Sequence, residues 1–347
     1  MKLARVVLDR MRADELGPAP SLVFSSDGEA GWRRLKRGAG FAYRDEIGRK
    51  PDDRDLARIR SLAIPPAWRD VWICKDDCGH IQATGRDEKG RKQYRYHAEW
   101  TQHRSTNKFE TLSAFAKVLP SLRAQVEADL RKRSLGYERL VASVVWLLDN
   151  SLIRVGNPTY ARENKSFGLT TLRTRHVEIT GHRLHFQFKG KSGKQWRLQM
   201  ADRRIATIVR SLQELPGQHL FKYEGADGLC PISSRDVNDY LAAFAGPEFT
   251  AKHFRTWAGT VRAFGLFADT DVPETRTAQV RTINAVIDQV AGRLGNTRSV
   301  CRQAYIHPAI VESWQAGELC RSGRLKPVDW LDEDEVETLA FLKRAGG

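Results

Sequence analysis

The spacing of the apolar residues changes near residue 107, and this change constrains the fold more than any other feature of the sequence. Before it, short apolar runs at 41–43, 71–74 and 93–96 are separated by glycines and charged pairs, which is typical of strands joined by turns. After it, apolar residues recur every three or four positions, which indicates helices. A chain of 347 residues is long enough for two domains. We therefore expect an α+β protein with a β-rich N-terminal domain over residues 1–105 and a mainly α-helical domain over residues 106–347.

The larger region contains several strong helical patterns. One covers residues 109–119 and is expected to end at Pro120, because proline cannot donate the backbone hydrogen bond that continues a helix. A second helix is expected over 122–132. A third, strongly apolar helix covers 140–148, and a further one covers 280–290 and closes at glycines.

A small sheet is expected between these helices. Apolar residues alternate with polar ones at 177–179, 184–188 and 196–200, which predicts three strands. The last two runs are joined by the glycine- and lysine-rich segment 189–194, in which glycines supply the positive φ angles of a tight turn. The sequence therefore places Lys191 at the tip of a β-hairpin.

The charge balance favours a polyanionic partner. There are 57 lysines and arginines against 42 acidic residues, which gives a net charge of +15 and suits nucleic acid. No apolar run reaches the length of a membrane span, and Met1–Arg12 lacks the apolar centre of a secretory signal. The odd number of cysteines, five, fits reduced thiols in a cytoplasm better than disulfides.

Two motifs that suggest a cofactor are incomplete. Cys74, Cys78 and His80 have the spacing of part of a zinc site, but no second pair of ligands follows. Gly190-Lys191-Ser192 looks like the end of a phosphate-binding loop, but His185 stands where that loop needs its first glycine. We therefore expect neither a bound metal nor ATP.

A set of five residues has the chemistry for breaking a phosphodiester without a metal. Tyr305 stands nine positions after Asn296, and Arg154, Lys191 and Arg255 precede them. A phenol is about three pKa units from ionisation at neutral pH, or about 4 kcal/mol, so cationic neighbours are needed to make it a nucleophile. Arginine binds the growing charge on phosphate oxygens, and lysine is able to protonate a leaving oxygen.

The contexts of these residues resemble those of the type IB DNA topoisomerases of the poxvirus and bacterial kind. The resemblance extends from about Ile64 to Tyr305, and its motifs in the catalytic region are Ile153-Arg154-Val155-Gly156, Gly190-Lys191, Lys252-His253-Phe254-Arg255-Thr256 and Ala304-Tyr305. It implies that Tyr305 is the nucleophile, that Arg154 and Arg255 hold the transition state, and that Lys191 is the general acid. Asn296 stands where the family commonly has histidine, and an amide at that place is able to donate a hydrogen bond but not to titrate.

A second motif of this family lies in the N-terminal region. Its pattern Lys-Gly-Arg-x-Gln-Tyr-x-Tyr is complete from Lys89 to Tyr96, with Arg91, Gln93 and Tyr94 at the matching positions. The resemblance implies that Lys89, Arg91, Gln93, Tyr94 and Tyr96 contact DNA, as do Tyr160 and Lys252. Alternation along a strand predicts that Arg91, Gln93 and Arg95 share one face and that the two tyrosines share the other.

The resemblance implies a function as well as a site. It predicts that the chain relaxes supercoiled double-stranded DNA in the bacterial nucleoid, as a monomeric clamp, through a 3′-phosphotyrosine, strand rotation and resealing. Two alternatives are a tyrosine recombinase and a basic DNA-binding module without activity. Recombinases usually carry histidine three positions before the second arginine, where this chain has Lys252. We further expect the segment after Tyr305 to be helical and to pack on the catalytic domain.

Overall fold

The computed structural model describes residues 21–225, 228–323 and 325–345, with only the backbone of residues 102–108. Met1–Arg12, for which no secretory signal was expected, lies outside the described residues. The predicted α+β class is confirmed, since an antiparallel sheet precedes a mainly helical region that holds a smaller sheet. The chain forms two compact units, residues 1–108 and 109–347, and the division falls within a single long helix.

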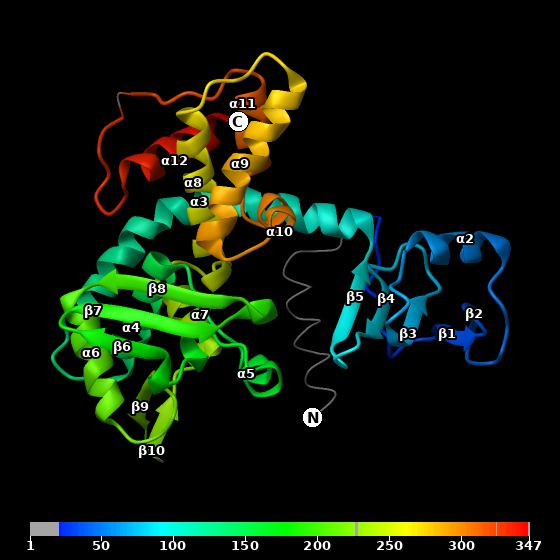
Figure 1. Cartoon of the computed structure of the whole chain (residues 1–347), viewed down its shortest axis with the longest axis horizontal. Coiled ribbons are helices and arrows are strands. Elements are labelled where there is room, and N and C mark those ends of the chain that lie inside the picture. The colour runs from blue at the N-terminus through cyan, green and yellow to red at the C-terminus, as the bar shows by residue number, and fades with distance from the viewer. Residues whose placement is uncertain (1–20, 226–227, 324, 346–347) are drawn as a thin grey trace. The chain divides into compact units, whose positions relative to one another are not determined.

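The first unit is built on an antiparallel sheet with the strand order β2-β1-β3-β4-β5 (Figure 1). The apolar runs expected to be strands form β2, β3 and β5. A short helix, α2, adds Ile59 to the small core on this sheet, where its side chain is 1% exposed beside Val71 and Ile73. The elements of this unit are β1 (Gly31–Arg37), β2 (Gly40–Arg44), α2 (Asp53–Ser61), β3 (Arg69–Cys74), β4 (Ile81–Arg86) and β5 (Lys92–Tyr96).

The prediction that a helix ends at Pro120 is wrong, because helix α3 extends over Ala98–Leu130. The helix runs through the proline as one element, although proline removes a backbone donor. Its apolar residues continue on one buried face on both sides of the proline, with Leu119 0% and Leu122 1% exposed. Burial of this face outweighs the local preference, because each buried leucine contributes about 1.5–3 kcal/mol.

The second unit has one continuous apolar core, to which its helices and the strands β6 and β7 contribute. The strongly apolar helix expected at 140–148 is α4, and the helix expected at 280–290 is α9, which ends at Gly295 in the left-handed conformation. Further helices of the second unit lie between α4 and α9 and after α9. The helices of this unit after α3 are α4 (Tyr137–Ser151), α5 (Pro158–Asn164), α6 (Arg203–Glu214), α7 (Ser234–Phe244), α8 (Ala251–Ala268), α9 (Arg276–Leu294), α10 (Arg298–Ala304), α11 (Pro308–Gln315) and α12 (Glu333–Ala345).

The expected three-stranded sheet is present in this unit. Strands β6 (Val177–Thr180), β7 (Arg183–Lys189) and β8 (Gln195–Ala201) are antiparallel neighbours in sequence order. The pairing of Lys189 with Gln195 closes a hairpin whose turn holds Lys191, as predicted. A two-stranded ribbon of β9 (Lys222–Gly225) and β10 (Gly228–Pro231) was not predicted.

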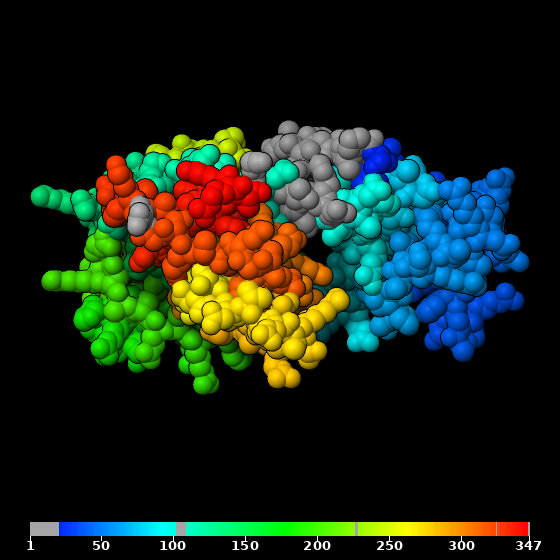
Figure 2. All heavy atoms as spheres, turned by 90° about the horizontal axis from the view of Figure 1, so that it is seen from above, coloured from blue at the N-terminus to red at the C-terminus, as the bar shows by residue number. Residues whose placement is uncertain are grey.

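The segment after Tyr305 packs on the rest of the second unit, as expected, but it is helical only in part, because a long loop separates helices α11 and α12. Helices α11 and α12 both contact α8, and Figure 1 shows them in orange and red beside α8 and α9. In the space-filling view, atoms from about residue 250 onward, yellow to red, form one continuous face of this unit (Figure 2). Within the described residues, no helix combines the length and apolar character needed to cross a membrane.

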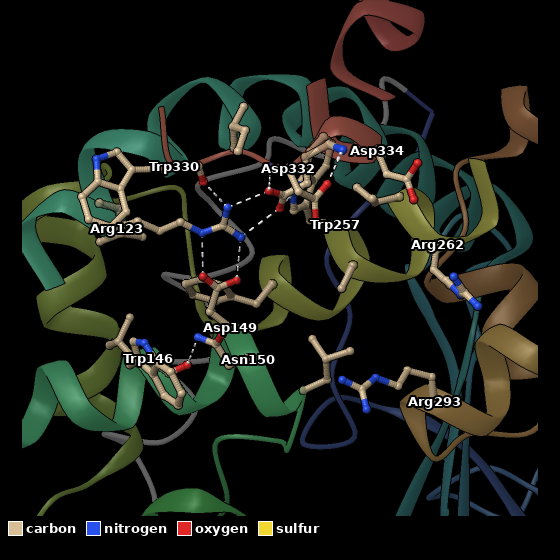
Figure 3. A pocket seen from close by; sticks show the side chains of 18 of the residues that line it. Arg123, Trp146, Asp149, Asn150, Trp257, Arg262, Arg293, Trp330, Asp332 and Asp334 are labelled. Atoms are coloured by element: carbon tan, nitrogen blue, oxygen red, sulfur yellow. Dashed lines mark hydrogen bonds and ion pairs between the residues drawn. The ribbon is translucent and has the colours of Figure 1, made fainter. Parts of the chain in front are cut away.

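Helix α12 is joined to α3, α4 and α8 by a largely buried ionic network around Arg123 (Figure 3). The Arg123 guanidinium donates to both carboxylate oxygens of Asp149 at 2.7 and 3.0 Å and to both oxygens of Glu335 at 2.7 and 2.9 Å. The indole of Trp257 donates a further hydrogen bond to Glu335 at 2.8 Å. The network lies in the wall of an open pocket of about 1190 Å³. Asp149 is on α4, which precedes Arg154, and Trp257 is on α8, which contains Arg255. Glu335 therefore links these two helices, directly through Trp257 and indirectly through Arg123.

Candidate active site

Arg154 lies in a loop that is fixed on both sides by backbone geometry. Helix α4 ends at Leu152 in the left-handed conformation, which turns the chain sharply before Arg154. The Arg154 carbonyl accepts a hydrogen bond from the backbone N–H of Leu169 at 2.9 Å. Gly168 packs so closely there that a Cβ on it would lie 2.4 Å from that carbonyl oxygen. The loop therefore holds the Arg154 backbone in one position.

Arg255 lies in the second turn of α8 and is 3% exposed. Its guanidinium donates to the carbonyl of Leu152, at the end of α4, and to the carbonyl of Leu294 at 2.6 Å, at the end of α9. Carbonyls at helix ends have no partner within their own helix and carry partial negative charge. A single arginine thus joins the ends of two helices, and the residues that follow those ends are Arg154 and Asn296.

Asn296 follows the glycine that ends α9. Its side-chain oxygen accepts a hydrogen bond from an Nη atom of Arg154, and its backbone N–H donates to the carbonyl of Ala291 at 2.9 Å. The side-chain amide nitrogen is buried, and no acceptor for it exists among the described residues. Asn296 therefore orients Arg154 through one end of its amide and keeps a donor at the other end.

Tyr305 is the residue that ends α10, and it is half-buried. The Cζ atom of Arg255 lies 5.2 Å from the centroid of its ring, and the Arg255 side chain also makes a hydrogen bond to the phenol. Burial alone would raise the pKa of Tyr305. The positive charges of Arg255, Arg154 and Lys191 outweigh burial, and the pKa is lowered. The phenol is therefore held in a setting that favours the phenolate.

Lys191 reaches this group from the hairpin between β7 and β8. Its side chain is exposed, and the turn has positive φ angles at Ser192 and Gly193. The structure thus forms two contacting pairs from the expected residues, Arg154 with Asn296 and Arg255 with Tyr305, and the charge of Arg154 also acts on Tyr305. It places Lys191 near enough for its charge to act on the phenol.

The group presents unused hydrogen-bond donors. The Nε–H of Arg255 is buried and, like the Asn296 amide nitrogen, has no acceptor among the described residues. Burial, with the charge of Arg154, lowers the pKa of Arg255 to about 10, which leaves it protonated at neutral pH. Buried donors without an acceptor are costly, so such atoms in one group indicate an absent acceptor. An anion with several oxygens, such as a phosphodiester, supplies acceptors of this kind.

The expected DNA-contacting motif lies on β5 and on the turn before it. The side chains of Arg91 and Gln93 both donate to the carboxylate of Asp87, at 2.7 and 2.9 Å, so these two residues share a face as predicted. Arg95 donates instead to the carbonyl of Ala63 at 2.9 Å. Lys89 is exposed in the turn.

The other face of β5 is aromatic and cationic. Tyr94 and Tyr96 stack with their ring centroids 5.8 Å apart, and the Nζ atom of Lys92 lies 5.4 Å from the Tyr94 centroid. Both tyrosines are exposed. Lys92 was missed as a site residue, although strand alternation places it with the two tyrosines. Asp87 was also missed, and no local pattern marks it.

The two remaining expected contacts lie in the second unit. Tyr160 is 54% exposed in the first turn of α5, whose N-cap Asn157 accepts from the Tyr160 backbone N–H at 3.2 Å. Lys252 is exposed in the first turn of α8, three residues before Arg255. The neighbouring His253 accepts from the backbone N–H of Thr250 at 3.0 Å and so helps to begin the helix.

The cysteines of the first unit do not form the ligand set that their spacing suggests. The imidazole of His80 is buried, and its Nδ1 atom accepts a hydrogen bond from the backbone N–H of Ser25 at 2.9 Å. Within the described ranges, one group of potential ligands has its atoms within 4.8 Å of one another, namely Asp76, Asp77 and Cys78. All three are exposed and belong to the first unit, whereas Tyr305 belongs to the second.

Comparisons with known proteins agree with this arrangement. The profile of the family described as "Eukaryotic DNA topoisomerase I, catalytic core" matches residues 97–319, and that of "Bacterial DNA topoisomerase IB, N-terminal domain" matches residues 40–87. The chain is 32% identical over 295 residues to DNA topoisomerase 1B of Acanthamoeba polyphaga mimivirus, covering 81% of this chain and 87% of the viral protein. It is 22% identical over 232 residues to DNA topoisomerase 1B of vaccinia virus, covering 66% of this chain and 70% of that protein.

Proposed function

The chain belongs to the type IB DNA topoisomerases, and on this premise we propose that it relaxes supercoiled duplex DNA by cutting and resealing one strand through Tyr305. The main support is the group around that residue. A phenol with a lowered pKa contacts Arg255, and two buried donors of Arg255 and Asn296 have no acceptor among the described residues. This combination suits a nucleophile that attacks a phosphodiester.

Strand cleavage follows from these contacts. The phenolate oxygen of Tyr305 attacks the phosphorus, its proton having gone to solvent, and the bond from phosphorus to the 5′ oxygen breaks. Negative charge grows on the non-bridging oxygens, where Arg154, Arg255 and Asn296 donate hydrogen bonds. The products are a phosphotyrosine at the 3′ end and a free 5′ end.

Lys191 completes the reaction as the general acid. A departing 5′ alkoxide is a strong base, so a proton delivered to it lowers the barrier. The Lys191 ammonium gives this proton and forms a 5′ hydroxyl. Resealing runs the same steps backward, with Lys191 accepting the proton. The covalent bond to Tyr305 keeps the ester for resealing, so the cycle needs neither ATP nor a metal.

The first unit supplies DNA affinity in this proposal. Arg91 and Gln93 would contact bases or phosphates from one side of β5, and Lys92, Tyr94 and Tyr96 would contact the backbone from the other. We propose that a monomer binds one duplex with both units, in a bacterial cytoplasm. Because each lysine or arginine on a phosphate releases counterions, the affinity falls steeply as salt rises.

The test is relaxation of a supercoiled plasmid that carries no chosen recognition sequence, with a chelator present and ATP omitted. The wild-type protein is expected to relax the plasmid and, when quenched with denaturant, to leave protein covalently bound to a 3′ end. Tyr305→Phe is the matched control and is expected to bind DNA without forming an adduct. Binding without any adduct from the wild-type protein would contradict the proposal, and so would recombinant products formed without relaxation.

A further inference from the structure

Trp196 lies between two glycines that come from distant parts of the second unit. A Cβ on Gly190 would be 2.7 Å from Cδ1 and Nε1 of the indole, and a Cβ on Gly295 would be 2.7 Å from its Cζ2. The five-membered ring therefore faces the hairpin turn, and the six-membered ring faces the end of α9. Contacts this close require glycine at both places, because any side chain would force either the indole or the turn to shift.

The indole is itself fixed to the sheet. Trp196 is directly opposite Phe188 in the pairing of β7 with β8, and their rings stack with an interplanar angle of 3° and a centroid distance of 6.0 Å. Phe188 is 4% exposed and belongs to the main core. Stacking on a buried partner leaves the half-buried indole little freedom to rotate.

Each of the two glycines is next to a residue of the candidate site. Gly190 precedes Lys191, and Gly295 precedes Asn296, which binds Arg154. The hairpin turn has internal hydrogen bonds, such as the one from Gly190 N–H to the Lys194 carbonyl at 2.8 Å. Those bonds set the shape of the turn but not its position against α9.

We propose that Trp196 is a positioning residue that sets the place of Lys191 relative to Asn296 and Tyr305. This inference rests on the proposed function and adds a residue to it. The indole acts as a spacer of fixed width between the turn that carries the general acid and the turn that carries the phosphate donor. Without it, Lys191 remains on a formed hairpin but is no longer held beside the leaving oxygen.

This role makes a chemical prediction. Loss of Lys191 placement affects chiefly the delivery of a proton to the 5′ oxygen, because Arg255 and Arg154 lower the pKa of Tyr305 more than Lys191 does. A DNA substrate with sulfur in place of that bridging oxygen needs no such proton, because a thiol is far more acidic than an alcohol, with a pKa of about 8.5. A defect in proton delivery therefore appears with the oxygen ester and not with the sulfur ester.

The experiment compares single-turnover cleavage of the two esters. Trp196→Ala is expected to slow the oxygen ester by about 10- to 100-fold, which is at most the lower end of the contribution of general acid catalysis because Lys191 itself is kept, and to leave the sulfur ester near the wild-type rate. Lys191→Ala is expected to show the same pattern with a larger loss. The double variant should be no slower than Lys191→Ala, since both changes remove one function.

Two further variants separate positioning from folding. Gly190→Ala keeps the indole and the backbone, since Gly190 has φ −93°, but pushes the turn away from Trp196. It is expected to slow the oxygen ester selectively. Leu198→Ala, on the same strand and also packed on the main core, is expected to lower the melting temperature without selectivity between the esters.

The outcomes are distinct. If Trp196→Ala and Gly190→Ala slow both esters equally, or slow neither, the inference is wrong even though the proposed function stands. If the wild-type protein forms no adduct, or Tyr305→Phe forms one, the proposed function fails instead. Partial recovery of the oxygen-ester rate in Trp196→Phe, which keeps a flat ring on Phe188, would support the spacer role.

Discussion

The guanidinium of Arg255 binds the ends of two helices and also lies over the ring of Tyr305, with its Cζ atom 5.2 Å from the ring centroid. The carbonyls that it binds, from Leu152 and Leu294, immediately precede the segments of Arg154 and Asn296. One buried side chain therefore builds the frame of the site and contacts the proposed nucleophile.

We expect Arg255→Lys to lower the rate of covalent adduct formation by about 100- to 1000-fold, the usual cost of removing an aligned donor. An ammonium group lacks the planar fork that reaches two carbonyls and the phenol together. Rapid-quench trapping of the adduct measures the effect. Arg262→Lys, at an exposed arginine on the same helix, is the control and should react normally. A wild-type rate of adduct formation in Arg255→Lys would show that the planar guanidinium of Arg255 is not required at this position.

The ionisation of Tyr305 offers a second test. Burial raises its pKa, but the charges of Arg255, Arg154 and Lys191 lower it by more. A positive neighbour stabilises the phenolate, so removal of one must raise the pKa. We expect Arg154→Ala to move the titration of Tyr305 to higher pH. The phenolate absorbance is recorded as the difference from the same protein carrying Tyr305→Phe.

The comparison variant for this titration is Arg162→Ala, which removes an exposed arginine from α5. It should leave the midpoint where the wild-type protein has it. A midpoint that moves to lower pH in Arg154→Ala would show that Arg154 does not stabilise the phenolate.

Asn296 has two separable roles in the structure. Its oxygen accepts from Arg154, and its amide nitrogen is a buried donor without an acceptor among the described residues. We expect Asn296→His to remain active, because a ring nitrogen is able to donate, and Asn296→Ala to lose much of its cleavage rate. Asn296→Asp keeps the acceptor and removes the donor, so it should be as slow as Asn296→Ala or slower. Cleavage by Asn296→Ala at the wild-type rate would refute the assignment.

Asp87 is expected to matter for DNA binding although its charge opposes it. Its carboxylate orients the side chains of Arg91 and Gln93, and we expect Asp87→Ala to weaken binding to duplex DNA. Glu88→Ala removes the same charge from an exposed neighbour, so it should bind equally well or slightly more tightly. Equilibrium binding at fixed salt compares the two. Tighter binding by both variants would show that only the charge matters.

His176 gives a prediction about stability. Burial, with the charges of Arg175 and Arg173, lowers its pKa from the ordinary 6.5 to about 4, and its Nδ1 atom accepts from the backbone N–H of Arg173. Between pH 6.5 and about 4, His176 therefore binds a proton more readily in the unfolded chain than in the folded protein. The free energy of unfolding falls as the pH drops through this range. The loss should be about 1–3 kcal/mol.

Denaturant unfolding of wild-type protein and His176→Gln at several pH values checks this. Glutamine keeps an acceptor for Arg173 but does not titrate, so the variant should lose less stability in acid. His182→Gln changes an exposed histidine and should follow the wild-type protein. Equal acid sensitivity of His176→Gln and wild type would exclude His176 as the cause.

Features set by local chemistry were predictable from the sequence. The hairpin at 189–194 and the end of α9 depend on glycines that allow positive φ, and those glycines are visible in the sequence. The strands of the small sheet follow from alternation, because one face of each strand is buried. The five candidate active-site residues were identified from motifs, and all five lie in the second unit.

Features set by distant contacts were not predictable. Helix α3 passes Pro120 because Leu119 and Leu122 are buried by other helices, which no local signal reports. The use of Arg255 as a link between helix ends depends on the left-handed turn at Leu152, a residue type that rarely adopts it. The contacts of Trp196 required knowing that Gly190 and Gly295 lie on either side of one ring.

The link from Glu335 to Arg123 and Trp257 has a consequence for synthesis. A ribosome produces Tyr305 and every other proposed catalytic residue before it produces Glu335. A nascent or clipped chain that ends before α12 would carry the nucleophile, but Arg123 would have only Asp149 as an anionic partner and Trp257 would lack its acceptor. The frame of helices behind the candidate site would then be completed last, when the carboxylate of Glu335 joins Arg123 and Trp257.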